Sequence, residues 1–237
     1  TGLYSQSTQM TSFVPTAVND VVARVAYPIE CELQDNEEEL QRRFFQMLRM
    51  TCFVLFPLMM GLAALAEPVV RLLLTDKWIE TVPLIRILCF AWIWWPASNM
   101  SWQLLNAKHR SDYCLKAEII KKVIAISILV FSLFWGIKVV CIGMLLYYVA
   151  DVYVITVFSA RVLPGVTFAS EMKSMLPILA YAAVMGTGVY LLDHMISSDA
   201  VSLAAGTAAG IVLYMAVTLL TGSREAWYLL EMIKKRR

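Results

Sequence analysis

One carboxylate lies in the middle of a strongly apolar stretch of this sequence. Residues 139–160 hold 22 positions, and Asp151, at the thirteenth, is the only charged residue among them. An isolated charge at the centre of a membrane costs on the order of 2.5–3.5 kcal/mol on insertion scales, so it must be neutralised, paired or hydrated. Asp151 is therefore a candidate ion-coupling group that binds a proton or a cation. The alternative is a protonated, hydrogen-bonded aspartic acid with no coupling role.

A stripe of polar side chains runs along the first predicted helix, over residues 3–27. At 100° per residue one face collects six polar positions: Ser5, Gln9, Ser12, Thr16, Asp20 and Arg24. Asp20 and Arg24 stand one turn apart and can pair, which lowers the cost of both charges. A polar stripe in a membrane faces other helices or water. It predicts a helix that lines an aqueous lumen, and the alternative is a packed seam between helices.

A second polar set lies in the predicted helix over residues 84–106. Trp95, Asn99 and Gln103 recur at intervals of four and share one side of a continuous helix. Amides that bond hydroxyl groups, beside flat aromatic faces, are suited to a sugar-binding wall. Two alternatives stay open: tryptophans near a helix end often form an interfacial belt, and buried amides often bond between helices.

The composition excludes a soluble protein. Of the 237 residues, 59% are hydrophobic and 16% are charged, and the mean hydropathy is +0.66. A soluble domain carries about 25% charged residues. The sequence predicts an all-α integral membrane protein. Its uncharged stretches predict about seven transmembrane helices in residues 1–222, over 3–27, 45–66, 84–106, 117–137, 139–160, 174–193 and 200–222.

The distribution of basic residues predicts the orientation. Alternate connections, together with the C-terminal end, hold 16 of the 20 Lys and Arg residues, and four lie on the opposite side. Basic residues concentrate on the cytoplasmic side of a membrane protein. We therefore expect a multi-pass protein with a cytoplasmic C-terminus. Residues 223–237 are predicted to form an amphipathic basic tail on the cytoplasmic surface.

The remaining motifs exclude other classes of function. The five cysteines are scattered and follow no disulfide or metal-ligand spacing. The sequence has no Gly-rich phosphate loop, no metalloprotease motif and no basic aromatic helix for nucleic acid. We expect no metal, no cofactor and no nucleic-acid partner. The polar first helix would begin outside the membrane and has no leader before it, so we expect this chain to be the C-terminal part of a longer one.

Two stretches resemble a known family. Residues 3–40 (LYSQSTQMTSFVPTAVNDVVARVAYPIECELQDNEEEL) and residues 61–74 (GLAALAEPVVRLLL), followed by Lys77 and Trp78, are similar to bacterial lipopolysaccharide and exopolysaccharide flippases. These belong to the multidrug/oligosaccharidyl-lipid/polysaccharide exporter superfamily. The resemblance continues to Lys122. The chain departs from the usual pattern at Thr75, where glycine is common, and at Cys31, where serine is common.

The resemblance implies a fold, a substrate and partners. The chain would be the second lobe of a two-lobe exporter, whose first lobe is a missing partner, in contact with membrane lipids of the bacterial inner membrane. It would move undecaprenyl-pyrophosphate-linked oligosaccharide between leaflets by alternating access and would not be an enzyme. The lumen would be lined by the candidate residues Gln9, Thr16, Asp20, Arg24, Trp95, Asn99 and Gln103, with Asp151 as the coupling group. Arg24, near the cytoplasmic mouth, would meet the pyrophosphate.

Two rival functions remain open from the sequence. A cation-coupled multidrug exporter would share the same architecture. A membrane-embedded polysaccharide polymerase or ligase is disfavoured because such enzymes usually carry catalytic residues in a long periplasmic loop, whereas the longest outer connection here runs only from Glu67 to Arg86.

Overall fold

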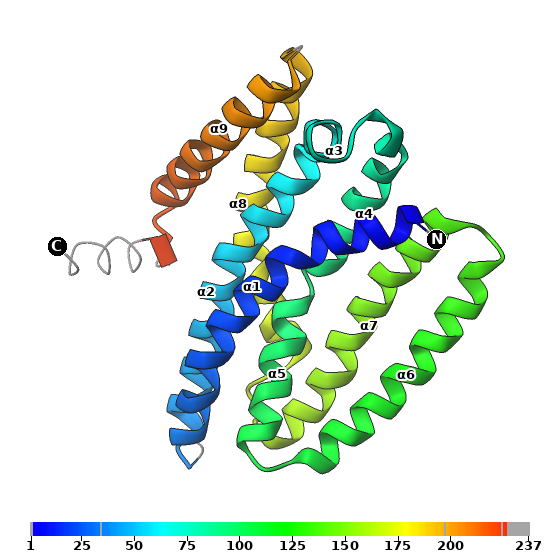
Figure 1. Ribbon diagram of the computed structural model, residues 1–237. Coiled ribbons are helices and arrows are strands. Elements are labelled where there is room, and N and C mark those ends of the chain that lie inside the picture. The colour runs from blue at the N-terminus through cyan, green and yellow to red at the C-terminus, as the bar shows by residue number, and fades with distance from the viewer. Residues whose placement is uncertain (1, 34, 197, 224, 227–237) are drawn as a thin grey trace.

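The computed structural model is a bundle of helices (Figure 1). It describes residues 2–33, 35–196, 198–223 and 225–226, without the side chains of residues 19–21, 23, 25, 26 and 133. In this part the helices are α1 (Gly2–Glu32), α2 (Glu37–Ala64), α3 (Ala66–Leu74), the 3-10 helix η1 (Asp76–Thr81), α4 (Val82–Trp92), α5 (Trp95–Ala107), α6 (Ser111–Leu133), α7 (Ile137–Val162), α8 (Phe168–Met195) and α9 (Asp199–Leu220). The all-α class is confirmed. The predicted tail lies almost wholly outside the described residues.

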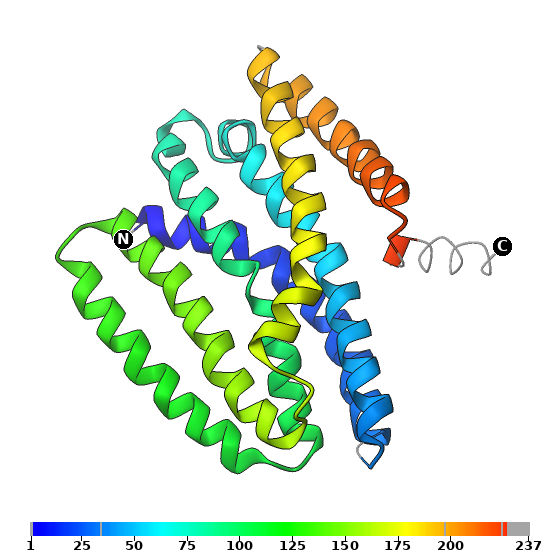
Figure 2. The same ribbon diagram turned by 180° about the vertical axis from the view of Figure 1, so that it is seen from behind.

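The long helices cross the bundle in alternating directions (Figures 1 and 2). The connections after α1, α5 and α7 gather at one end. The connections after α2, α6 and α8 gather at the other end. This alternation is the one expected of a multi-pass membrane protein, whose helices each run from one membrane surface to the other.

Helix α2 forms the centre of the main hydrophobic core. Asn36 caps its first turn, because the Asn36 side chain accepts a hydrogen bond from the Glu39 amide at 3.2 Å. Leu40, Leu48 and Leu55 are fully buried along it. Helix α8 packs along α2, and the hydroxyl of Tyr214 on α9 donates to the Phe53 carbonyl at 2.9 Å. These contacts fix α8 and α9 against the central helix.

The third predicted span is not continuous. Residues 84–106 were expected to form one helix, but α4 ends at Trp92 and α5 starts at Trp95. Pro96 explains the break: it has no backbone N–H to donate and is accommodated in the first turn of α5. The positions of Trp92 and Asn99 are therefore not related by the turn angle of a single helix.

Five helical stretches in the described residues are long and apolar enough to span a membrane: α2, the run from Asp76 to Ala107, α7, α8 and α9. The expected spans at 3–27 and 117–137 are also helical, as α1 and α6, but are not among these five stretches. The outer face of α6 is apolar nonetheless, with Val123 60% and Ile126 61% exposed. The chain is a multi-pass membrane protein.

Candidate functional site

The polar stripe of α1 lies on the surface of the bundle. Gln9, Thr16 and Arg24 are exposed, and the Thr16 hydroxyl donates to the Ser12 carbonyl within the same helix at 2.7 Å. The side chain of Asp20 lies outside the described residues, so its pairing with Arg24 stays a prediction. The exposed stripe is available to line a water-filled space beside the bundle.

The candidate residues of α5 lie deeper. Trp95 is half-buried against the main core, and Asn99 is half-buried. Gln103 is only 7% exposed, and its Oε1 atom has no hydrogen-bond partner. A buried carbonyl oxygen without a partner costs free energy, so Gln103 is suited to accept a hydrogen bond from a bound hydroxyl or water.

Asp151 is buried and paired. The Ser98 hydroxyl donates to Asp151 Oδ2, and Lys121 Nζ lies 2.7 Å from Asp151 Oδ1. The side chains of Lys121 and Asp151 are 7% and 8% exposed. The sequence left two alternatives for Asp151: an ion-coupling group, or a protonated acid with no coupling role. The observed geometry fits a charged Asp151 that is paired with an ammonium group.

Lys121 lies near the start of the span predicted over residues 117–137, and it was counted with the basic residues that precede that span. It lies inside α6, where it also contacts Glu118 Oε1 at 2.8 Å and stands 5.2 Å from the centre of the Trp102 ring. One signal for this arrangement is visible in the sequence: a lone mid-membrane carboxylate must be neutralised, paired or hydrated.

Glu171, which the sequence analysis did not single out, is a second buried carboxylate. It is fully buried in the first turn of α8. The Ser101 hydroxyl donates to Glu171 Oε1 at 2.8 Å, and the Thr156 hydroxyl donates to Oε2 at 2.7 Å. The sequence signal was the pair of small hydroxyl residues Ser98 and Ser101, one turn apart on α5.

The two carboxylates share one side of α5. Ser98 bonds Asp151 on α7 and Ser101 bonds Glu171 on α8, whereas Asn99 and Gln103 lie about 100–160° away around α5. Apart from Trp95 at the start of α5 and Asn99 and Gln103 on its far side, the polar residues form two sets. One set is a buried polar cluster within α5, α6, α7 and α8: Ser98, Ser101, Lys121, Asp151, Thr156 and Glu171. The other is the exposed stripe of α1, and the structure does not bring Asp151 to it.

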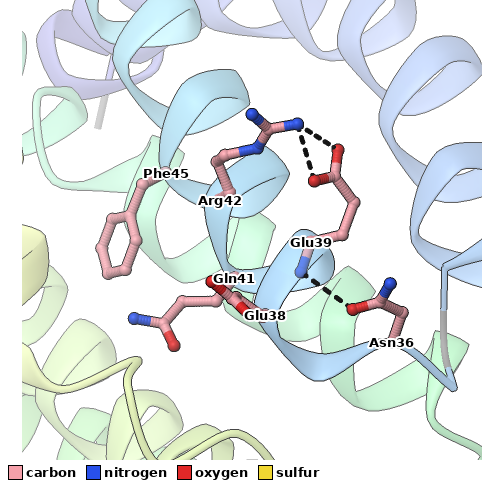
Figure 3. A pocket seen from close by; sticks show the side chains of 6 residues that line it. All are labelled: Asn36, Glu38, Glu39, Gln41, Arg42 and Phe45. Carbon is pink, nitrogen blue, oxygen red and sulfur yellow. Dashed lines mark hydrogen bonds and ion pairs between the residues drawn. The ribbon is translucent and has the colours of Figure 1, made fainter.

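A surface pocket lies at the start of α2 (Figure 3), lined by Asn36, Glu38, Glu39, Gln41, Arg42 and Phe45. Its one basic residue, Arg42, is already paired with Glu39 Oε2 at 2.7 Å. The acidic lining is unsuited to a pyrophosphate, and none of the candidate residues contributes to it. The described residues also hold no group of three or more His, Cys, Asp or Glu side chains that could bind a metal ion.

Comparisons with known proteins bear on this arrangement. Residues 1–83 match a family described as polysaccharide biosynthesis protein. An uncharacterized membrane protein in the cps region of Klebsiella pneumoniae is 30% identical over 135 residues, 57% of this chain and 28% of the relative. The lipopolysaccharide biosynthesis protein WzxC of Escherichia coli K12 is 28% identical over 120 residues, 51% of this chain and 24% of the relative. The resemblance to polysaccharide flippases is confirmed. The aligned part covers about a quarter of each relative's length.

A solved structure supports the same fold. The lipid II flippase MurJ, in an inward closed conformation, matches with a TM-score of 0.71 at 17% sequence identity. The match covers 92% of this chain and 47% of MurJ. The helical arrangement of this chain is therefore similar to that of about half of this solved structure.

Proposed function

We propose that this chain is one lobe of a two-lobe transporter that moves lipid-linked oligosaccharide across the bacterial inner membrane by alternating access. The observation that carries the proposal is the exposed polar stripe on α1, with Gln9, Thr16 and Arg24 on the surface of an otherwise apolar bundle. Exposed polar side chains within a membrane mark a water-filled path. The flippase-like fold and the polysaccharide-related relatives support this kind of substrate over a drug.

The roles follow from chemistry and position. The lumen is lined by the α1 stripe and by Asn99 and Gln103, whose amides bind sugar hydroxyls. Arg24 contacts the pyrophosphate of an undecaprenyl carrier at the cytoplasmic mouth, because a guanidinium binds phosphate oxygens in a bidentate way. The first lobe, the missing partner, closes the lumen, and the C-terminus lies in the cytoplasm. Asp151 acts as the ion-coupling group when Lys121 is displaced from it.

The test uses the full-length protein in a strain that lacks its own flippase. The chain offers a matched pair: Thr16 and Thr187 are both exposed, and each hydroxyl donates to the carbonyl four residues earlier, at 2.7 and 2.8 Å. Surface polysaccharide and the lipid-linked oligosaccharide left on the cytoplasmic leaflet are measured together. We expect Thr16→Val and Arg24→Ala to reduce export and Thr187→Val to leave it intact.

The outcomes separate the rival functions. Normal export by both Thr16→Val and Arg24→Ala contradicts the lumen assignment. Accumulation of cationic drugs without a polysaccharide defect in the deletion strain indicates a multidrug exporter. Short surface chains with normal translocation indicate a polymerase or ligase.

A further inference from the structure

Glu171 differs from Asp151 in the kind of group that holds it. Asp151 bonds the Ser98 hydroxyl and also forms an ion pair with the Lys121 ammonium group. Glu171 is held by the hydroxyls of Ser101 and Thr156. A hydroxyl can donate or accept, so these partners suit either protonation state.

The two states can be written out for Glu171. In the ionised form both hydroxyls donate to the carboxylate, as observed. In the protonated form the new O–H of Glu171 donates to one of these oxygens. A Ser or Thr hydroxyl in a helix can then turn its own proton to the carbonyl one turn earlier. No buried polar atom of the cluster loses its partner in either state.

The surroundings of Glu171 have opposite effects on its protonation state. Full burial favours a neutral Glu171, because an ionised carboxylate in a low-dielectric interior loses its hydration. The α8 N-terminus and the two hydroxyl bonds favour the anion. Opposed effects of this kind leave both protonation states within reach.

Other titratable groups near Glu171 do not neutralise it. On α2, Cys52 is a buried thiol facing Glu171, and Arg49 is paired with Glu225 at 3.3 Å. On α7, Asp151 is paired with Lys121, and on α8 itself Lys173 is exposed. Within the described residues no basic side chain forms an ion pair with Glu171.

We propose that Glu171 is a reversible proton-binding site at the junction of α2, α5, α7 and α8, separate from the Asp151–Lys121 pair. Its bonds reach Ser101 on α5 and Thr156 on α7, so its protonation state alters how the start of α8 is held against both helices. A role for this proton in driving transport rests on the proposed function. The binding of a proton at Glu171 does not depend on that function.

The binding test is infrared difference spectroscopy of the full-length protein in lipid vesicles over a pH series. The protonated acid gives a carbonyl stretch that the carboxylate lacks. We expect a carbonyl band that grows as pH falls, that is absent in Glu171→Gln and that persists in the double variant Asp151→Asn, Lys121→Met. Glu171→Asp, which keeps a carboxyl group, retains a band with a shifted midpoint. Melting temperatures establish that each variant is folded.

Thr156→Val tests the hydroxyl part of the proposal. It removes a donor to the anion, so the midpoint of the band moves to higher pH. A band that is unchanged in Glu171→Gln, or a Glu171 band that does not vary with pH, overturns the site. A midpoint unchanged in Thr156→Val overturns the role of the hydroxyl.

The transport role has its own measurement. Export by the wild-type protein is expected to vary with pH across the midpoint, and export by Glu171→Gln is expected to vary less. Identical pH profiles overturn the coupling role of Glu171. If the wild-type protein exports no oligosaccharide, the proposed function fails while the infrared result still decides the proton site.

Discussion

Lys121 on α6 and Asp151 on α7 form a buried ion pair, with Nζ and Oδ1 2.7 Å apart. The Ser98 hydroxyl of α5 donates to the same carboxylate, so the pair joins three helices. A buried pair is costly to break by removing one partner, because the other charge stays behind without compensation. The pair therefore holds the α6–α7 hairpin against α5.

The first prediction separates the structural and coupling roles of Asp151. Asp151→Asn leaves the buried Lys121 with only Glu118 on its own helix as an ionic partner, and it is expected to lower stability by up to about 3–5 kcal/mol. The double variant Asp151→Asn, Lys121→Met removes both charges at similar volume and is expected to recover most of that loss. Melting temperatures in detergent rank the stability of the wild type, the single variant and the double variant. If Asp151→Asn is as stable as the wild type, the ion pair between Lys121 and Asp151 does not stabilise the fold.

The same variants bear on transport. If Asp151 couples an ion, the stable double variant fails to export oligosaccharide. Normal export by the double variant would show that the pair serves the fold alone.

The second prediction concerns the glycines of α9. A Cβ added at Gly210 would lie 3.2 Å from Val189 Cγ2 on α8, and one added at Gly206 would lie 2.8 Å from Leu65 Cδ2. Small residues at this spacing let helices approach closely in membranes. Gly210→Leu is expected to destabilise the protein by about 1–3 kcal/mol through overpacking.

Gly61 supplies the control for this prediction. It lies inside α2, with nothing within 4 Å of an added Cβ. Leucine favours a helix over glycine by somewhat less than about 1 kcal/mol, so Gly61→Leu is expected to be neutral or slightly stabilising. Equal melting temperatures for the two variants would exclude close packing at Gly210.

The third prediction tests whether the α1 stripe faces water. Thr16 belongs to the polar stripe, with the exposed Phe13 at its border, whereas Thr187 lies near Val184 and Leu191, which are 54% and 60% exposed. In the full-length protein with Cys31→Ser, Thr16→Cys is expected to react with a membrane-impermeant maleimide, and Thr187→Cys is expected not to react. The reverse pattern would mean that the stripe packs against protein and that α8 borders the water-filled path.

Periodicity and charge were enough to predict the helices and their alternation, because a membrane-spanning segment must satisfy its backbone within itself. They were not enough to predict partners between helices. Lys121 falls near the start of the span predicted over residues 117–137, but α6 begins ten residues before it, at Ser111, and carries Lys121 inward. Glu171 was passed over because it precedes the apolar part of α8.

The α4–α5 break exposes a related limit. Pro96 signals an irregularity in a helix, but it does not tell whether the chain kinks or interrupts its hydrogen bonds. The interruption changes the relative rotation of Trp92 and Asn99. Ser98 and Ser101 were overlooked because their importance depends on carboxylates that lie 53 and 70 residues away along the chain.

The last prediction concerns the departure from the flippase pattern at Thr75. The structure gives Thr75 a φ of 76° and a ψ of 165°, between α3 and η1. This backbone region is essentially reserved for glycine, and a β-branched residue there stores about 1–3 kcal/mol of strain. Thr75→Gly is therefore expected to raise the melting temperature, although glycine also gains freedom in the unfolded chain. The matched control is Thr187→Gly inside α8, which is expected to cost about 0.3–0.5 kcal/mol, because glycine is a poorer helix former than threonine. A loss of stability in both variants would mean that Thr75 is held without strain.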